Sequence, residues 1–526
     1  MSVAEQTQRP SDAGLPLAVD LDGTLVHGDA FFEGILRMLF VSPLNLFTLL
    51  GWLTRGRAYA KARIAERYPV NAAILPYDAR LLEWLRAERK KGRTIALATA
   101  SDERVARAVA DHVGLFDAVF ASDGKTNLKS TRKAESLSQA YPRGFVYAGN
   151  EGADLKVWRA AAGAVTANCS SALHANAARV CTVERSFPRE GNALVAFVRA
   201  IRPQQWVKNL LVFLPMLVGQ GWADLGAWVS ASIAFGALSL SASAVYLVND
   251  AADIDADRVH PRKRTRPFAS GALSPAWGLA GALVLLVGGL ALAALAQVVT
   301  LTLLYLAVTT AYTFVLKRVA LVDVFTLAGL YTIRIILGGA ATTYFASDWL
   351  LAFSCFFFLS LALVKRVAEA RDLAARGANE FSRRGYQAGD ADVLTMMGVS
   401  AGFIAALVLS LYLQDDTAAA HYTEPFLLWG LPAASVFWTC RVWLIASRGE
   451  MHDDPIVFAA RDKWSWLVAA LAIACFAAAV LGPDPDAGPS IADLFAAARI
   501  YEDLGLLEEA CSRYEQALAV RRDVAL

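Results

Sequence analysis

The chain has 526 residues, of which 56% are hydrophobic and 19% are charged, and its mean hydropathy is +0.40. This average is too apolar for an ordinary soluble protein and indicates a membrane protein. The formal net charge of +2 conceals local asymmetry and says little about partners. The six cysteines follow no CxxC or metal-ligand spacing, and we interpret them as reduced packing residues: Cys169, Cys181, Cys355, Cys440, Cys475 and Cys511.

The first 195 residues alternate short apolar runs with charged helical stretches, a pattern typical of a Rossmann-like α/β domain. Five of the runs are interpreted as buried parallel strands: 15–20, 94–99, 117–122, 144–150 and 164–168. The first 15 residues are polar and show no cleavable signal peptide. We therefore expect the amino terminus to stay cytosolic.

The stretch LAVDLDGTL places Asp20 at the carboxyl end of a hydrophobic strand, with Asp22 two residues later and Gly23 permitting a tight turn. This DxDGT pattern resembles the haloacid dehalogenase-like phosphatases. The resemblance implies that Asp20 is the nucleophile that forms an aspartyl phosphate and that Asp22 is the general acid/base. It also implies that both carboxylates ligate Mg²⁺.

Later parts of the same resemblance follow in family order. Thr99 ends a strand where its hydroxyl can bond the phosphoryl group. Lys129 can neutralise that group, with Lys125 and Lys133 as alternatives, and Asp154 is implied as a late Mg²⁺ ligand.

One position departs from this family pattern. Asn150 stands where the family usually has aspartate. An amide oxygen can still ligate Mg²⁺, but one negative charge is lost from the metal site. Weakened or redirected phosphatase activity is one consequence, and a catalytically inactive regulatory domain is the alternative.

Residues 29–75 form an insertion after the first motif, with an apolar run at 35–53 that is interrupted by Pro43. A tenth membrane span here would reverse every later loop and violate their charge pattern. We therefore predict a cap that lies on the membrane surface or re-enters it. Four basic residues would then meet anionic headgroups: Arg55, Arg57, Lys61 and Arg63. A soluble cap with a buried helical hairpin is the alternative.

After residue 195, nine apolar runs come close to the ~20 residues that cross a bilayer. They are 206–222, 228–249, 275–294, 297–316, 320–340, 348–365, 394–413, 424–445 and 464–482. If the amino terminus is inside, the outer loops near 223–227, 295, 341–347 and 414–423 contain no Lys or Arg. This positive-inside pattern predicts an all-α bundle of nine transmembrane helices over 196–482, in the cytoplasmic membrane, with the carboxyl terminus outside.

Acidic residues follow the second apolar run. Asn249, Asp253 and Asp257 are spaced i, i+4 and i+8 and share one face of a continuing helix, with Asp250 beside them. Hard oxygen ligands in this arrangement favour Mg²⁺, with phosphate oxygens completing its coordination. The spacing therefore predicts a Mg²⁺–diphosphate site.

Basic residues come next, and Lys263, Arg264 and Arg266 can hold an anion by charge-assisted hydrogen bonds. The alternative for this whole segment is a positive-inside loop whose acids serve solubility. That alternative explains the acidic spacing poorly, because acids at a membrane helix end usually serve function.

The segment NDAADIDADRVHPRKRTRP, 249–267, is similar to the NDxxDxxxD and RxxRP pattern of the UbiA-type intramembrane prenyltransferases, whose nine helices surround a central cavity. Three further stretches resemble the branch that includes decaprenyl-phosphate phosphoribosyltransferase: 201–215, 312–318 and 363–370. Aromatic prenyltransferases carry a second aspartate-rich motif, where this chain has Lys365, Arg366 and Glu369. The resemblance implies phosphoribosyl diphosphate as the donor and a polyprenyl phosphate as the acceptor.

The same resemblance implies roles for individual residues. Asn249, Asp250, Asp253 and Asp257 would hold Mg²⁺, which stabilises the departing pyrophosphate, and Asp250 and Asp253 are the catalytic pair. Candidates for binding substrate are Lys208, Asn209, Lys263, Arg264, Arg266, Tyr312, Lys317, Lys365, Arg366 and Glu369. Each lysine has an alternative as a snorkelling anchor, and Glu369 has one as an ion-pair partner of Arg366.

The two motif sets together predict two successive reactions. Phosphoribosyl transfer leaves a 5-phosphate on the lipid-linked sugar, and the fused hydrolase could remove it. The alternatives are prenyl transfer from a prenyl diphosphate to a small aromatic acceptor, and a lipid-binding or transport protein with a non-catalytic hydrolase-like domain. We expect an isoprenoid lipid, a diphosphate donor and membrane lipids as partners, and no nucleic acid; the sequence does not report the oligomeric state.

Residues 483–526 form a predicted helical tail. The stretch 493–520 resembles a single tetratricopeptide-like helix pair. Because one repeat cannot bury its own faces, it would pack on the membrane domain or on a partner. An amphipathic hairpin without a special role is the alternative.

Overall fold

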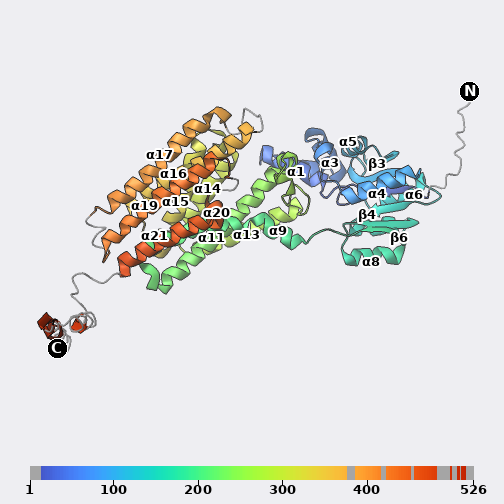
Figure 1. Cartoon of the computed structure of the whole chain (residues 1–526). Coiled ribbons are helices and arrows are strands. Elements are labelled where there is room, and N and C mark those ends of the chain that lie inside the picture. Colours follow the sequence, from blue (N-terminus) through green and yellow to red (C-terminus); the bar gives the residue numbers. More distant parts are fainter. Residues whose placement is uncertain are drawn as a thin grey trace, which may run out of the picture. The chain divides into compact units, whose positions relative to one another are not determined.

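The computed structural model describes residues 14–375, 385–415, 422–451 and 455–481, together with 494, 498–499, 506, 508–509 and 511–516. The chain forms two compact units (Figure 1). The first comprises Met1–Pro203 and Gly236–Ala294, and the second comprises Gln204–Phe235 and Leu295–Leu526. The segment that carries the aspartate motif therefore belongs to the same compact unit as the α/β domain. The predicted tail falls mostly outside the described residues.

The α/β domain is built on a six-stranded parallel sheet of order β3-β2-β1-β4-β5-β6. Its strands are β1 Leu17–Val19, β2 Ile95–Asp102, β3 Ala118–Ser122, β4 Val146–Gly149, β5 Gly163–Ala167 and β6 Thr182–Phe187. The five predicted strands are confirmed. The sixth was missed because four of the six residues of its sequence, TVERSF, are polar and the strand lies at the edge of the sheet. In this order β1 and β4 flank the switch point at which such sheets bind ligands.

Both faces of the sheet are covered. Leu17 and Val19 pack into one apolar core and Ala18 into another, because successive side chains of a strand point to opposite faces. The helices between and after the strands are α4 Ala79–Lys90, α5 Glu103–Val113, α6 Thr131–Ala140, α7 Leu155–Trp158, α8 Ser171–Val180 and α9 Ala193–Ile201. The predicted Rossmann-like α/β class is confirmed.

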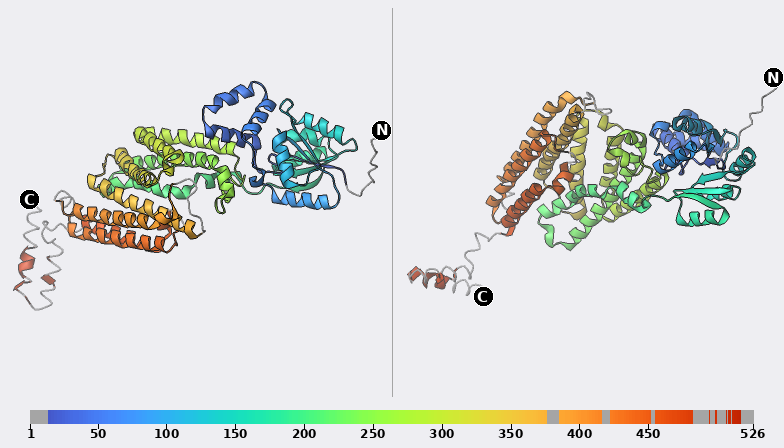
Figure 2. Two further views of the ribbon diagram at one scale, coloured as in Figure 1. Left: turned by 90° about the horizontal axis from the view of Figure 1, so that it is seen from above. Right: turned by 45° about the vertical axis from the view of Figure 1, so that its right-hand side comes forward.

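The insertion after β1 is a lobe of three helices, α1 Ala30–Val41, α2 Asn45–Leu53 and α3 Arg57–Arg67 (Figure 2). Pro43 separates α1 from α2, which have 12 and 9 residues and are too short to cross a bilayer. α1 packs closely on α3 through Gly34, where an added Cβ would lie 2.4 Å from Ile64 Cγ2. The insertion is therefore a helical cap and not a tenth span.

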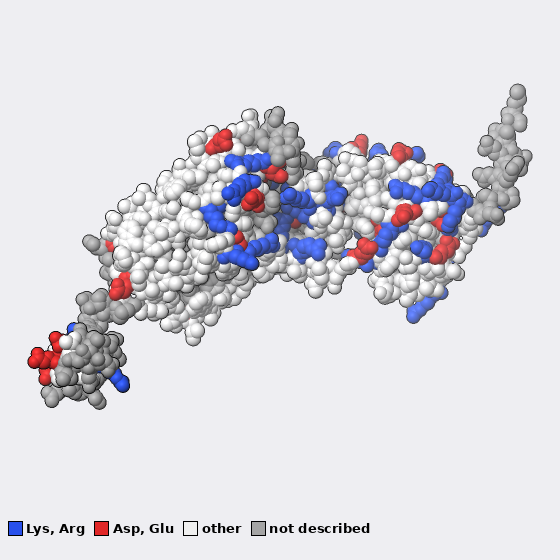
Figure 3. Space-filling model, in the orientation of Figure 1, with Lys and Arg blue, Asp and Glu red and all other residues white. Residues whose placement is uncertain are grey.

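Eight helices among the described residues are long and apolar enough to cross a membrane. They are formed by α11 Leu225–Ala252, α13 Pro275–Leu295, α14 Val299–Phe314, α15 Val322–Thr342, α16 Asp348–Ala375, α17 Ala391–Tyr412, α19 Gly430–Ser447 and α21 Lys463–Leu481. Between their ends, the faces of α17, α19 and α21 visible in Figure 3 are almost free of charged side chains. Such uncharged surfaces are what a lipid environment requires.

The expected span at 206–222 is not a regular α-helix, so the prediction of nine membrane helices is not confirmed. This segment is the 3-10 helix η3 Pro203–Phe213, followed by the five-residue α10 Leu214–Val218. Its backbone lies against Gly338 of α15, where an added Cβ would be only 2.0 Å from the Val212 carbonyl oxygen. Hydropathy reports the apolar character of this segment but not its backbone conformation.

Two candidate active sites

The first site is a pocket of about 830 Å³ at the carboxyl ends of β1 and β4. Five predicted hydrolase positions line it: Asp20, Asp22, Lys129, Asn150 and Asp154. Gly23 makes the turn after β1 with φ +76°, and an added Cβ would lie 2.0 Å from Asn150 Nδ2. Glycine is therefore required there for conformation and for space.

A buried network fixes the nucleophile candidate. Lys133 of α6 donates hydrogen bonds to Asp20 Oδ1 at 2.9 Å and to the Tyr147 hydroxyl at 2.7 Å. The Tyr147 hydroxyl in turn donates to Asp154 Oδ1 at 2.9 Å. The backbone N–H groups of Asn150 and Glu151 donate to the other oxygen of Asp154, each at 2.9 Å.

The structure differs from the sequence-based choice of the phosphate-neutralising lysine. Lys133 contacts Asp20, whereas Lys129 forms an ion pair of 2.9 Å with Glu151 at the pocket edge. Both lysines follow the same loop, but Lys133 lies one helical turn further along, inside α6. Lys133 is therefore better placed than Lys129 to neutralise a phosphoryl group on Asp20.

Thr99 also lies differently from its predicted role. It is fully buried, it is not among the residues that line the pocket, and its hydroxyl accepts a hydrogen bond of 3.0 Å from the backbone N–H of Ser101. The Ser101 hydroxyl donates to Asp22 Oδ2, and the backbone N–H of Ala30 donates to Asp22 Oδ1 at 2.8 Å. Ser101 and Ala30 thus orient the predicted general acid/base.

Burial changes the acidity of both motif aspartates. It raises the pKa of Asp20 to about 6, although the Lys133 ammonium opposes the shift. It raises the pKa of Asp22 to about 7, and the nearby Asp29 carboxylate adds to the rise. Closely spaced, desolvated carboxylates fit a cation, because a cation relieves their repulsion. Asp20, Asp22, Asp154 and the Asn150 amide are hard-oxygen ligands of the kind that Mg²⁺ prefers.

The second site begins where α11 ends. Asp253 interrupts the helix before the short α12 Ile254–Val259, yet the backbone N–H groups of Asp253 and Asp257 still donate to Asn249 O and Asp253 O, at 3.0 and 2.8 Å. The i, i+4, i+8 relation among these three residues therefore persists through the break. Lys263 and Arg264 lie further on, in the 3-10 turn Lys263–Thr265.

Arginine holds two of the acids together. Arg266 Nη1 lies 3.2 Å from Asp250 Oδ1 and 2.7 Å from Asp257 Oδ2, and both carboxylates are buried. Arg202, which the sequence reading did not single out, also donates to Asp250 Oδ1 and stacks on the Tyr246 ring at 5.3 Å. Burial raises the pKa of Asp257, although Arg266 opposes the shift. Arginine thus balances the acidic charge at this end of α11.

The acids at this site are chemically suited to Mg²⁺ but do not enclose an ion by themselves. Within the described part of the chain, no three His, Cys, Asp or Glu side chains are grouped closely enough to hold a metal ion. Mg²⁺ commonly takes one or two carboxylates and completes its shell with water and substrate phosphates. Asp250 and Asp257, with Asn249 and Asp253 on the same turns, fit this sparse type of site.

In the second unit, the predicted residue Asn209 contacts a buried cation that the sequence analysis missed. Asn209 Oδ1 accepts a hydrogen bond of 2.9 Å from Arg334 Nε, and Arg334 Nη2 donates to the Tyr305 hydroxyl at 3.2 Å. The Arg334 guanidinium also lies 5.4 Å from the centre of the Tyr331 ring, and Lys208 Nζ lies 5.8 Å from the same centre. An arginine in the apolar run of α15 was the available signal.

Arg366 lies in a second polar cluster of this unit. It forms an ion pair of 2.6 Å with Asp323, an ion pair with Glu369 and a hydrogen bond of 3.0 Å to the Tyr312 hydroxyl. The side chains of Arg366 and Asp323 are both fully buried. The alternative in which Glu369 pairs with Arg366 thus has direct geometric support. Asp323, an acid within an apolar run, was also missed. Two further predicted cations belong to this unit. Lys317 lies in the 3-10 turn Leu316–Arg318, and Lys365 directly precedes Arg366 in α16.

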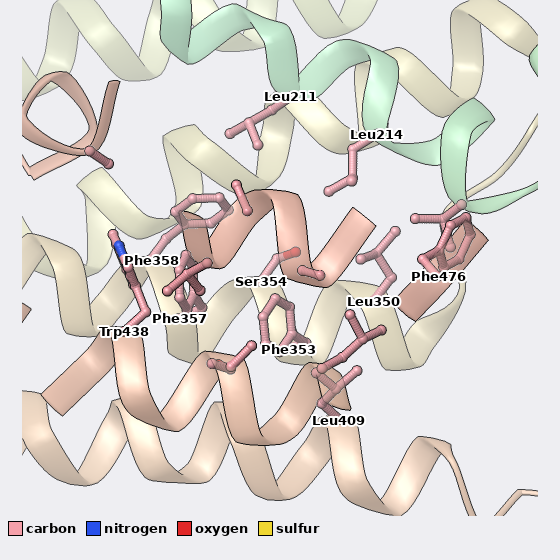
Figure 4. A pocket seen from close by; sticks show the side chains of 18 of the residues that line it. Leu211, Leu214, Leu350, Phe353, Ser354, Phe357, Phe358, Leu409, Trp438 and Phe476 are labelled. Carbon is pink, nitrogen blue, oxygen red and sulfur yellow. The ribbon is translucent and has the colours of Figure 1, made fainter. Parts of the chain in front are cut away.

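An apolar cavity of about 630 Å³ lies among η3, α10, α16, α17, α19 and α21. The side chains of Leu211, Leu214, Phe353, Phe357 and Phe358 gather around it (Figure 4). Its size falls within the range of small-molecule pockets. Its lining suits a hydrocarbon chain rather than a charged group.

Comparisons with known proteins agree with these features. The model of the UbiA prenyltransferase family matches residues 211–460. The uncharacterized protein y4nM of Sinorhizobium fredii is 37% identical over 477 residues, which cover 89% of this chain and 92% of that protein. The nodulation protein NoeC of Azorhizobium caulinodans is 34% identical over 285 residues, covering 53% of this chain and 91% of that protein.

A decaprenyl-phosphate phosphoribosyltransferase of Mycolicibacterium smegmatis is 39% identical over 196 residues, which cover 36% of this chain and 61% of that enzyme. The chain belongs to the UbiA prenyltransferase family. The matched residues follow the parallel α/β domain that carries the DxDGT motif at Asp20 and Asp22.

Proposed function

We propose that this protein transfers phosphoribose from phosphoribosyl diphosphate to a polyprenyl phosphate and then removes the 5-phosphate of the product. The identity to decaprenyl-phosphate phosphoribosyltransferases supports the first reaction. The observation that carries it most directly is the Asp250–Arg266–Asp257 arrangement, in which two buried carboxylates share one guanidinium. Acids for Mg²⁺ and a base for phosphate oxygens are what a departing diphosphate requires.

In the transferase step, the lipid phosphate attacks C1 of the ribose, and pyrophosphate leaves with the electron pair of the broken bond. Bound Mg²⁺ would stabilise the charge that develops on the pyrophosphate. Asp250, Asp253, Asp257 and Asn249 would hold the ion.

In the hydrolase step, Asp20 would attack the 5-phosphate and form an aspartyl phosphate, while Asp22 protonates the leaving sugar oxygen. Water would then attack the phosphorus atom of the aspartyl phosphate and give its proton to Asp22, which releases inorganic phosphate and restores Asp20. The hydrogen bonds from the Ser101 hydroxyl to Asp22 Oδ2 and from the Ala30 N–H to Asp22 Oδ1 support this role, because they fix the orientation of the carboxyl group. Lys133 would neutralise the phosphoryl oxygens. Asp20, Asp22 and Asp154 do not enclose an ion by themselves, and they would hold Mg²⁺ together with water and the oxygens of the substrate phosphate, with the Asn150 amide in place of a fourth carboxylate.

The cap would meet the membrane. Val41, Leu44 and Phe47 at the α1–α2 corner are each 72% exposed, and an aqueous cap would not favour such a cluster. The nearby residues Ile35 and Leu53 line the hydrolase pocket. A lipid-linked substrate could therefore extend from the pocket onto this apolar corner. We place both sites on the cytosolic side of the cytoplasmic membrane, with the amino terminus in the cytosol.

One donor-specificity assay tests the proposal. Purified protein in lipid vesicles is given labelled phosphoribosyl diphosphate or a labelled prenyl diphosphate, each with polyprenyl phosphate and with a small aromatic acceptor. We expect lipid-linked ribose from the first donor and accumulation of lipid-linked ribose phosphate in the Asp20→Asn variant. Product from the prenyl diphosphate alone would overturn the transferase assignment. Equal products from wild type and Asp20→Asn would overturn the hydrolase step.

A further inference from the structure

Four side chains form a closed ring of alternating charge between the hydrolase cap and the aspartate segment of the transferase. Arg258 donates to both oxygens of Glu33, at 2.9 and 2.7 Å. Arg37 donates to both oxygens of Asp255, at 2.6 and 2.8 Å. Within α1, Arg37 Nη2 lies 3.6 Å from Glu33 Oε2. Within α12, Arg258 Nη1 lies 3.8 Å from Asp255 Oδ1. All four belong to the first compact unit.

The ring is more than a surface contact. The side chains of Arg258 and Glu33 are only 4% exposed, and both ion pairs that bridge α1 and α12 are bidentate. Exposed pairs contribute little to a structure, whereas a buried charge that loses its partner is strongly unfavourable. The ring therefore fixes α12 against α1.

The ring is connected to the carboxylates at the transferase site. Arg258 Nε donates a hydrogen bond of 3.1 Å to the carbonyl of Ala269. That carbonyl belongs to the turn in which the Ser270 N–H donates to Arg266 O at 2.9 Å. Arg266 contacts Asp250 and Asp257. A continuous set of contacts thus runs from Glu33 in the cap to both carboxylates.

The loop after the aspartate motif also forms part of the hydrolase site. An added Cβ at Gly271 would lie 1.9 Å from the His27 carbonyl oxygen, so the two backbones are in direct contact. Ser270, Gly271, Ala272 and Ser274 line the same pocket as Asp20. One segment therefore contributes to the surroundings of both candidate sites.

We propose that the hydrolase cap is a positioning element of the transferase. Through the ring of Glu33, Arg37, Asp255 and Arg258, it holds the turn after α11 and Arg266 in the arrangement that receives Mg²⁺ and diphosphate. This inference rests on the proposed transferase function. It also gives a role to Asp255, an acid within the motif segment that lies outside the predicted ligand set.

The test uses the full-length protein in vesicles and breaks the ring at its more exposed pair. Arg37→Gln removes the bidentate contact to Asp255, and Arg37→Lys retains the charge. Arg107→Gln is the matched control, because the Arg107–Glu103 pair at 2.6 Å is also an arginine–carboxylate pair but lies exposed on α5. Three quantities are measured: the Mg²⁺ concentration that half-saturates transfer, hydrogen exchange of peptides covering 249–258 with and without Mg²⁺, and hydrolysis of a small soluble phosphomonoester.

We expect Arg37→Gln to raise the half-saturating Mg²⁺ concentration by roughly tenfold or more, the scale seen when residues that orient metal ligands are lost. Mg²⁺-dependent protection of 249–258 should fall in parallel, while hydrolysis of the soluble phosphomonoester is retained. Arg37→Lys should lie between wild type and Arg37→Gln, and Arg107→Gln should match wild type.

Two results would overturn the inference while leaving the proposed function intact. One is an Arg37→Gln enzyme with the Mg²⁺ dependence and exchange of the Arg107→Gln control. The other is equal loss of transfer and of phosphomonoester hydrolysis, which would mark a general folding defect of the unit. An inactive wild-type transferase would instead refute the proposed function, and hydrogen exchange would still report whether the ring orders the turn.

Discussion

Lys133 donates a hydrogen bond of 2.9 Å to Asp20, whereas Lys129, four residues earlier, pairs with Glu151. The ammonium of Lys133 is therefore placed to neutralise a phosphoryl group on Asp20. We expect Lys133→Ala to lower hydrolysis of a soluble phosphomonoester by at least about 10²-fold, the scale for losing one electrostatic stabiliser. Lys129→Ala should lower the hydrolysis of the same phosphomonoester by a clearly smaller factor. A steady-state assay of both variants decides between them, and a larger loss at Lys129 would reject the assignment.

The raised pKa values of Asp20 and Asp22 predict how the stability of the α/β domain varies with pH. In the folded state each carboxyl retains its proton up to about pH 6 or 7, whereas the unfolded chain releases it near 3.8. The folded state thus binds more protons between these values, so its stability falls as the pH rises from about 4 to about 7. Above about pH 7 both carboxyl groups are ionised in the folded state as well, so the stability of the domain decreases no further through these groups.

Hydrogen exchange of β1 and β4 peptides in the presence of EDTA measures this effect. Protection should decrease from pH 5 to pH 8 after correction for the intrinsic exchange rate. In Asp22→Asn, protection should decrease less from pH 5 to pH 8 than in wild type, because an amide does not ionise. Mg²⁺ should reduce the decrease in wild type, since the cation favours the ionised carboxylates. A variant with the full wild-type pH dependence would show that Asp22 is not the titrating group.

Local sequence patterns were sufficient for the parts of this fold that local chemistry determines. Apolar runs of strand length predicted five of the six strands, and the DxDGT pattern placed Asp20 and Asp22 at the end of β1. The i, i+4 spacing of Asn249, Asp253 and Asp257 also survives in the backbone hydrogen bonds. These features depend on neighbours within about two helical turns.

Contacts between distant residues were not predictable in this way. Arg37 and Asp255 are 218 positions apart, and Glu33 and Arg258 are 225 apart, so nothing local pairs them. The prediction of a membrane helix at 206–222 was not confirmed for a related reason. The 3-10 backbone of this segment packs on Gly338 of α15, which is more than 100 positions away. Arg334 and Asp323 carried a readable signal, a charge within an apolar run, that should have marked them as site candidates.

The hydrogen bond between Asn209 and Arg334 predicts a non-additive pair of substitutions. Asn209→Leu leaves the buried Arg334 guanidinium without one of its acceptors, which should destabilise the second unit by about 1–3 kcal/mol. Adding Arg334→Met removes the cation that had lost its partner. The double variant should therefore be less destabilised than the sum of the single variants.

Thermal unfolding in detergent, followed by tryptophan fluorescence, gives the four corners of this double-mutant cycle. A coupling energy near zero would mean that Arg334 is stabilised by its stacking on Tyr305 and Tyr331 and not by the amide. Transfer activity measured alongside separates stability from function.

The exposed corner of the cap predicts a substrate-dependent effect on the hydrolase. Phe47 is 72% exposed beside Val41 and Leu44, and burying a phenylalanine in lipid is worth about 1.5–3 kcal/mol. Replacing it with a charged residue forfeits that energy, so Phe47→Asp should lower hydrolysis of a lipid-linked phosphomonoester in vesicles by about tenfold or more. Hydrolysis of p-nitrophenyl phosphate, which has no lipid chain, should be unchanged. Phe47→Leu keeps the apolar surface and should behave as wild type with both substrates. Equal loss on both substrates in Phe47→Asp would instead assign the corner to the folding of a soluble cap.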